Sequence, residues 1–295
     1  MTDAWDDPWG ASATADASEP AAANPWTPLS RRIAGLGPDE TVHDGIPGYM
    51  LGALHDWVDT VYNVAEYDRN SEALDNTLRL RLRWEQVPTP DTLTEEQLLD
   101  VIDAILRWWT MRPALREEIA EILTTGGAGW RVTAEGTALE RRVDETVTAT
   151  VIHTVSNVTA DAADHLAAAW RAAYGRHADP DKVFHEAIRA VESIACPLVE
   201  VKKAENGKAT LGTVIGELAN NSGHKWELVL PGPTGAPRDV TPLVTMLELL
   251  WQAQVSRHGG APKSRRQEQA EAEAAVHLAA TLVQWLGSGV LHKKV

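Results

Sequence analysis

The chain has little of several features that many proteins use for stability or anchoring. Among 295 residues there is one cysteine, Cys196, which excludes an internal disulfide and favours a reducing, cytoplasmic location. No apolar run approaches the roughly 18 uncharged residues that a membrane-spanning helix needs. The amino-terminal segment is acidic rather than basic, so neither a transmembrane segment nor a signal peptide is expected.

Motifs for nucleotides and metals are also missing. Neither G-x-x-x-x-G-K-[ST] nor H-E-x-x-H occurs, and "GGAGW" at 126–130 lacks the lysine and the hydroxyl residue of a phosphate loop. The ten histidines have no paired Cys/His spacing. A P-loop nucleotide site is therefore excluded, and no metal and no other cofactor is expected.

Positive charge is scarce as well. The chain has 27 Lys and Arg against 42 Asp and Glu, a formal net charge of -15. Binding of a polyanion needs a positive footprint, so the surface as a whole is not expected to bind nucleic acid, although a local patch could. Phenylalanine is scarce too: one Phe against twelve Trp means that tryptophan supplies much of the aromatic core volume.

Composition divides the rest of the chain into an acidic tail, two helical regions and a joint. Residues 1–24 contain five acids and no base, and they cannot bury enough apolar surface to offset the entropy of ordering, so a disordered tail is expected. Residues 25–128 are expected to form a helical domain. The glycine-rich stretch 129–136, with the β-like "WRVTA", is the expected joint. Residues 137–295 are expected to form a helical bundle. The predicted fold class is all-α.

Helical periodicity and capping signals carry this prediction. Thr94 with Gln97 forms a capping box, and Asp179 before Pro180 predicts another helix start, in a helix that Pro197 is expected to close. The stretch "SEALDNTLRLRLRWEQ" alternates like a strand near its end, yet its leading residues favour a helix. "LERRVDETVTATVIHTVSNV" is expected to be helical throughout. The last helix is expected to bury Ala274, Leu278, Leu282 and Leu286.

The stretch "WQAQVSRHGGAPKSRR", from Trp251 to Arg266, gathers positive charge and contains no acid; its cations are Arg257, Lys263, Arg265 and Arg266. It reads as a glycine-rich turn whose last two arginines begin the next helix. Cations are disfavoured in the first turn of a helix, so a nearby anion is expected to relieve the cost. That anion is either an internal acid, Glu268 or Glu248, or an RNA or DNA phosphate.

A polar stripe of His185, Arg189 and Glu192 lies on the helix that begins at Pro180. Residues three and four apart on a helix touch, and such pairs are usually solvated surface pairs. Glu192 lies closer to the inward edge of the helix than the other two, next to Val191.

Four segments between His165 and Leu286 resemble, in this order, the C-terminal helical domain of abortive-infection proteins of the AbiJ kind, a branch of the HEPN-like superfamily. They are "HLAAAWRAAYGRHADPDKVFHEAIRAVESIACPLV", "ATLGTVIGEL", "LLWQAQVSRHGG" and "EAEAAVHLAATLVQWL". The chain also resembles uncharacterised proteins of actinobacteria and their bacteriophages. The resemblance implies a bundle of four or five helices that commonly dimerises.

The same resemblance implies a site. Active HEPN proteins cut RNA without metal, using an arginine and a histidine in an R-x(4–6)-H motif at a helix end, often helped by an acid on another helix. Here it implies His258, followed by Gly259, as the catalytic histidine and Glu192 as the supporting acid. Lys263, Arg265 and Arg266 are then expected to bind RNA.

The chain departs from that motif, because Gln252, Ala253 and Gln254 stand where the arginine is expected and Arg257 directly adjoins His258. Either Arg257 or Arg265 substitutes, or the domain is non-catalytic. Two functions stay open: a phage-defence or phage–host conflict protein that binds RNA or cuts it as a metal-independent endoribonuclease, and a non-catalytic factor that binds a host or phage protein. A DNA-binding role for "TLGTVIGEL" is weaker, because its apolar spacing fits core packing.

Overall fold

The structure is a computed structural model that describes residues 27–37, 39, 41–232, 235, 237–256 and 264–294. The chain forms two compact units, Met1–Val42 and His43–Val295. In the described part of the first unit, the short helix α1 (Leu29–Ile33) buries no side chain. The second unit holds two hydrophobic clusters, one made by residues 46–139 and the other by residues 151–291.

Most of the described chain is helical, so the prediction of a mainly helical fold is confirmed. Five short strands in the described residues form two small antiparallel sheets, and only the first strand was expected. No helix among the described residues combines the length and the apolar character needed to cross a membrane.

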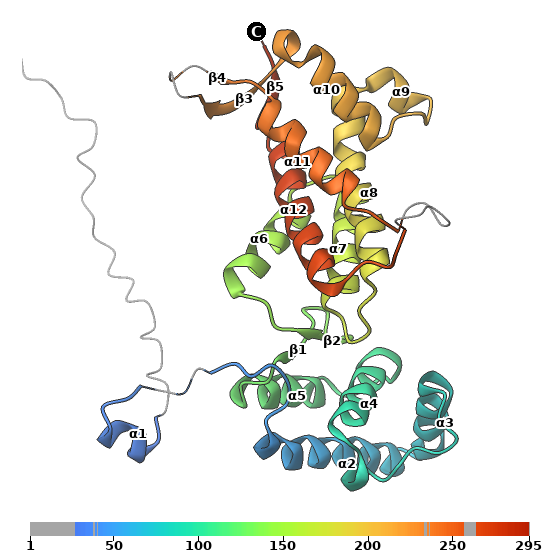
Figure 1. Cartoon of the computed structure of the whole chain (residues 1–295). Helices are drawn as coiled ribbons and strands as arrows, with labels where there is room; N and C mark the ends of the chain where they lie inside the picture. Colours follow the sequence, from blue (N-terminus) through green and yellow to red (C-terminus); the bar gives the residue numbers. More distant parts are fainter. Residues whose placement is uncertain are drawn as a thin grey trace, which may run out of the picture. The chain divides into compact units, whose positions relative to one another are not determined.

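Four helices build the first cluster (Figure 1): α2 (Leu51–Tyr67), α3 (Ser71–Leu82), α4 (Glu95–Trp108) and α5 (Pro113–Thr125). The ambiguous stretch is helical over Ser71–Leu82, as predicted, but its last four residues lie beyond the helix. Leu74 and Leu78 of α3 are buried one turn apart while Leu80 is exposed, which is helical rather than strand-like burial. The capping box predicted at Thr94 is present, with the Gln97 N–H donating to Thr94 Oγ1.

A β-hairpin follows this cluster. Strand β1 (Trp130–Val132) pairs antiparallel with β2 (Leu139–Arg141), and the backbone N–H of Leu139 donates to Asp103 Oδ1 of α4 at 2.7 Å. The prediction that residues from 139 onward are helical was therefore wrong. The backbone groups of residues 139–141 form their hydrogen bonds within the hairpin instead of within a helix. Helix α6 (Glu145–Ser156) begins only after Asp144, whose carboxylate accepts from the N–H of Thr146 and caps the first turn.

The remaining helices build the second cluster: α7 (Ala160–Tyr174), α8 (Pro180–Val199), α9 (Val201–Glu205), α10 (Leu211–Lys225), α11 (Thr241–Gln252) and α12 (Gln269–Gly287). The long helices α7, α8 and α12 pack against one another (Figure 1). Asp179 caps α8 by accepting from the Lys182 N–H, as predicted. The prediction that Pro197 ends this helix was wrong. Pro197 lies in the last turn of α8, which continues to Val199. The helix therefore loses only the one backbone hydrogen bond that the proline nitrogen cannot donate.

The buried face of α12 differs from the predicted one. Leu282 and Leu286 are buried as expected and Leu278 is partly buried, but Ala274 is exposed. The residues that face the core instead include Ala272, Ala275, Val276 and Ala279, and these small side chains allow α12 to approach α7 and α8 closely.

A second small sheet was not predicted. Helix α10 runs directly into β3 (Trp226–Pro231), which pairs antiparallel with β4 (Pro237–Arg238) and with β5 (Leu291–Lys293). Trp226, Leu228 and Leu291 are buried in the second cluster, so the sheet covers part of that core.

Candidate functional site

Three of the predicted site residues, His258, Arg257 and Lys263, lie outside the residues that the structure describes. Their proximity to Glu192 stays a prediction. The ends of the bend that carries them are described, however, and they show how the bend is attached to the helices.

Gln267 fastens both ends of this bend. Its side-chain oxygen accepts from the N–H groups of Val255 and Ser256 at 2.8 and 3.2 Å, and its side-chain nitrogen donates to the carbonyl of Ala253 at 3.1 Å. Its backbone N–H donates to Asp181 Oδ1, in the first turn of α8, at 3.0 Å. The glutamine is 6% exposed, so these bonds form away from solvent. The base of the bend therefore lies at the start of α8.

Glu192 lies further along the same helix. It is eleven residues beyond Asp181, which corresponds to about 16 Å along a helix axis. Its Oε1 accepts from the N–H of Leu211 at 2.7 Å, so the carboxylate caps the start of α10. Burial, with the charges of Glu192 and Glu200, raises the pKa of the nearby Cys196 thiol to about 11. The contact that Glu192 makes is a structural one.

Arg265 and Arg266 precede the last helix instead of opening it, so that part of the prediction was wrong. Helix α12 begins at Gln269, with Glu268 and Glu271 forming a capping box. Arg265 is paired with Glu271, and its hydrogen bonds, together with one from the Glu268 N–H, lower the pKa of Glu271 to about 2. An internal acid is thus paired with Arg265, but it is chiefly Glu271, which was not expected; Glu268, one of the two expected acids, lies 3.8 Å away.

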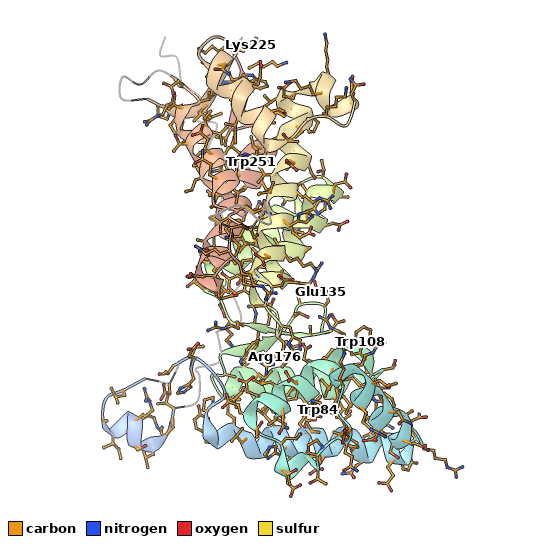
Figure 2. The ribbon with its side chains drawn as sticks, turned by 45° about the vertical axis from the view of Figure 1, so that its right-hand side comes forward. Trp84, Trp108, Glu135, Arg176, Lys225 and Trp251 are labelled. Atoms are coloured by element: carbon orange, nitrogen blue, oxygen red, sulfur yellow. The ribbon has the colours of Figure 1, made fainter. Side chains whose placement is uncertain are left out.

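A cavity of about 440 Å³ lies elsewhere, where the end of α7 and the start of α8 meet α3 and α4. Figure 2 labels two of its lining residues, Trp108 and Arg176. Charged side chains dominate the lining: Arg81, Arg107, Arg171, Arg176, His177 and Lys182, with Asp100, Asp103 and Asp179. We call this the cationic cavity.

The turn after α7 places His177 in this cavity. The helix ends at Tyr174, where the Gly175 N–H donates to the carbonyl of Arg171 at 2.9 Å. A Cβ atom on Gly175 would come within 2.5 Å of that carbonyl oxygen, so the chain needs glycine here. The Asp179 N–H then donates back to the carbonyl of Ala172 at 2.8 Å. This tight turn keeps His177 at the same end of the helix as Arg171.

Arg176 is a structural member of the cavity. Its Nε donates to Asp100 Oδ1 at 2.8 Å, it also pairs with Glu96, and its side chain is 11% exposed. Its guanidinium carbon lies 5.3 Å from the centre of the Trp130 ring. Arg176 thereby ties the turn after α7 to α4 and β1.

Other cationic side chains of the cavity form fewer interactions with the rest of the described chain than Arg176 does. The side chains of Arg107, Arg171 and Lys182 are exposed, and none forms a hydrogen bond or ion pair with another residue in the described part of the chain. Arg81 lies over the Trp108 ring, 3.7 Å from its centre, and Trp108 is itself exposed. In a chain of net charge -15, this combination gathers positive charge locally and can attract an anion.

Three acids, Asp100, Asp103 and Asp179, line the cavity with five Lys or Arg side chains, so they offset part of its positive charge. Asp100 is paired with Arg176, and Asp103 is buried. Burial raises the pKa of Asp103, against the opposing effects of the Leu139 N–H and of the charges of Arg107, His177 and Arg176. The carboxyl group therefore retains its proton more readily than an exposed aspartate.

The sequence carries a signal for this site apart from the pair His258 and Gly259. Arg171 precedes His177 with five residues between them, and no other arginine in the chain precedes a histidine with four to six between. This is the R-x(4–6)-H spacing, and it falls at a helix end. The prediction did not include it, because the resemblance placed the histidine at the His-Gly pair, His258 and Gly259.

Nothing in the described part of the chain gathers three His, Cys, Asp or Glu side chains in a way that could hold a metal ion. Comparisons with protein-family models, curated proteins and solved structures found no match for this chain.

Proposed function

We propose that this protein acts in phage defence or phage–host conflict by cleaving RNA, without metal, in the cationic cavity. The observation that carries the proposal is that Arg171 and His177, the one pair with the R-x(4–6)-H spacing, line the same cavity. The resemblance of residues 165–286 to AbiJ-type, HEPN-like proteins supplies the biological setting. A homodimer in the cytoplasm is part of the same proposal.

The chemistry suits RNA because the nucleophile is part of the substrate. His177 takes the proton of a 2′-hydroxyl as the 2′-oxygen attacks the adjacent phosphorus. The bond from phosphorus to O5′ breaks, water gives O5′ a proton, and the imidazolium returns its proton to solvent. The products are a 2′,3′-cyclic phosphate and a 5′-hydroxyl end. DNA lacks the 2′-hydroxyl and is not cleaved.

The cations hold the phosphate. Arg171 has no ion-pair partner in the described chain, so its guanidinium can contact the phosphate oxygens as negative charge builds up on them. Arg107 and Lys182 neutralise neighbouring phosphates of the strand. Asp103, on another helix and close enough to His177 to interact with its charge, takes the place of the supporting acid.

The test uses the purified full chain and a single-stranded RNA in the presence of EDTA. His177→Ala is expected to lower the cleavage rate by on the order of 10² or more, the usual contribution of a general acid or base. Arg171→Gln is expected to lower it by a similar factor. The expected product ends are cyclic phosphate and 5′-hydroxyl.

Two matched controls are available on α8. His185 and Arg189 are exposed and line neither this cavity nor another described cavity, so His185→Ala and Arg189→Gln should leave the rate unchanged. Wild-type protein that leaves RNA intact, or His177→Ala protein that cleaves at the wild-type rate, would overturn the proposal.

The second candidate is a non-catalytic factor that binds a host or phage protein. Strand β3 exposes two large apolar side chains, Val229 at 63% and Leu230 at 45%, and exposed apolar groups of this kind are common at protein interfaces. An inert wild-type protein that forms a complex sensitive to Val229→Asp would favour this candidate.

A further inference from the structure

Arg171 lines a second cavity as well as the cationic one. This second cavity, of about 360 Å³, is enclosed by the turn between β1 and β2 together with α6 and α7. Its lining is largely apolar, with Val132, Val151, Ile152, Val155, Ala167 and Trp170 among the residues that form it. We call it the apolar pocket. The two cavities thus share Arg171 as a lining residue.

Most polar groups of the apolar pocket are engaged in hydrogen bonds or ion pairs within the chain, but Glu135, in the turn between β1 and β2, also lines it and is exposed. Arg131 Nε donates to Glu140 Oε1 at 2.8 Å, and these side chains are 24% and 10% exposed. Thr148 donates to the carbonyl of Asp144 at 3.1 Å. A ligand group that enters therefore meets an apolar wall, a neutralised ion pair and the Glu135 carboxylate, which together suit a flat, weakly polar group better than an anion.

One of the apolar side chains that line the pocket is also exposed to solvent. Ile152 of α6 is 54% exposed although it lines the pocket. Covering such a side chain removes apolar surface from water and so contributes to binding. The volume of the pocket lies within the range of about 300–1,000 Å³ that small-ligand sites occupy. It is large enough to hold one nucleobase.

We infer that the apolar pocket receives an unpaired base of the RNA strand whose phosphate lies at Arg171. This inference rests on the proposed function. In a strand, each base is joined through its ribose to a phosphate, so adjoining apolar and cationic sites match the two halves of one nucleotide. Proteins that recognise single-stranded RNA commonly take up unstacked bases in this way. A duplex holds its bases stacked and paired, so the substrate is single-stranded RNA.

The test measures binding by fluorescence anisotropy, with full-length His177→Ala protein so that the RNA stays intact. Three labelled probes are compared: a short single-stranded RNA, the same backbone with abasic nucleotides, and the matching duplex. Stacking of one unpaired base on a protein side chain commonly strengthens binding about tenfold or more. We therefore expect the abasic strand and the duplex to bind about tenfold more weakly than the single strand, or weaker still.

Variants locate the effect in the pocket. Ala167→Phe fills it, and is expected to weaken binding of the intact strand about tenfold while leaving binding of the abasic strand unchanged. Ala149→Phe is the matched control, since Ala149 is exposed on α6 and lines neither cavity. If Ala167→Phe protein does not fold, Ile152→Ala provides the same test, because that side chain is already half exposed and its removal should weaken binding several-fold.

The outcomes separate this inference from the function beneath it. If Arg171→Gln weakens binding but the abasic strand binds as tightly as the intact one, the base pocket is wrong and the phosphate site stands. If filling the pocket changes nothing for the intact strand, the inference is likewise overturned. A protein that neither binds nor cleaves any RNA removes the proposed function itself.

Discussion

Arg171 and His177 line one cavity although the helix that carries the arginine ends between them, at Tyr174. A helix that simply continued would place residues six apart on different faces. The turn at Gly175 brings the histidine back to the end of the helix, where Arg107, Lys182 and Arg81 also lie. The local turn, rather than helical periodicity, therefore brings Arg171 and His177 into the same cavity.

This geometry makes Gly175 a test of positioning. In Gly175→Ala the new Cβ would meet the carbonyl oxygen of Arg171 at 2.5 Å, so the backbone of the turn must shift. We expect a loss of stability of about 1–3 kcal/mol, as for other overpacked sites, and a fall in the rate of RNA cleavage by folded protein. Denaturant unfolding and single-turnover cleavage measure the two effects.

The matched control is Gly216→Ala in α10. A Cβ there meets nothing within 4 Å, and alanine favours the helix over glycine. This variant should be as stable as the wild type or more so, with unchanged cleavage. Full activity in Gly175→Ala protein would show that the turn does not position His177.

Asp103 should give the protein a specific dependence of stability on pH. Burial raises its pKa, so the folded state holds the proton more tightly than the unfolded chain. The resulting stabilisation is fully present below the ordinary aspartate pKa of about 3.9 and is lost as the pH rises through the raised value. Asp103→Asn keeps an acceptor for the Leu139 N–H but carries no charge at any pH.

We therefore expect Asp103→Asn protein to be at least as stable as wild type at pH 7, with the difference shrinking towards pH 4. Asp103→Ala leaves the Leu139 N–H unpaired and should cost about 1–3 kcal/mol at both values. Denaturant unfolding at the two pH values provides the comparison. A wild type that exceeds Asp103→Asn in stability at pH 7 would contradict the raised pKa.

Gln267 distinguishes the cationic cavity from the basic bend as the place of cleavage. Gln267→Ala removes the bonds that tie Ala253, Val255 and Ser256 together, which should cost about 1–3 kcal/mol. Although the base of the bend contacts Asp181, none of its described residues lines the cationic cavity, so cleavage by the folded fraction should not change. Loss of cleavage without loss of binding at the cavity would favour His258 instead.

The Arg265–Glu271 pair predicts a second, acidic transition. The pKa of Glu271 is lowered to about 2, so its contribution to stability is present above the ordinary glutamate value of about 4.3 and is lost as the pH falls towards 2. Glu271→Gln should lower the melting temperature at pH 7, and the difference should nearly vanish near pH 2. Glu121→Gln, on an exposed position of α5, is the control and should show neither effect.

Local signals in the sequence predicted several elements well. The capping box at Thr94, the cap at Asp179 and the helix over residues 71–82 depend on interactions within one turn, and the structure confirms all three. Residues 139–141 form a strand instead of the expected helix, because they pair with β1 and receive an anchor from Asp103, 36 residues away. Hydrogen bonds between residues that lie far apart in the sequence do not affect the local spacing of apolar residues, so that spacing does not predict them.

The candidate site was harder to predict for the same reason. Its lining comes from α3, α4 and the junction of α7 with α8, so residues about 100 apart share one cavity. The spacing of Arg171 and His177 was visible in the sequence, but their shared environment was not. The hydrogen bond from the Leu211 N–H to Glu192 at the start of α10 could not be predicted either, since only the fold brings the two residues together.

The most direct measurement compares the RNA cleavage rates of two single-histidine variants, His177→Ala and His258→Ala, under identical metal-free conditions. We predict that His177→Ala lowers the rate by on the order of 10² or more while His258→Ala retains the rate of the wild type. The opposite pattern, with cleavage lost in His258→Ala and intact in His177→Ala, would contradict the assignment of the active site to the cationic cavity.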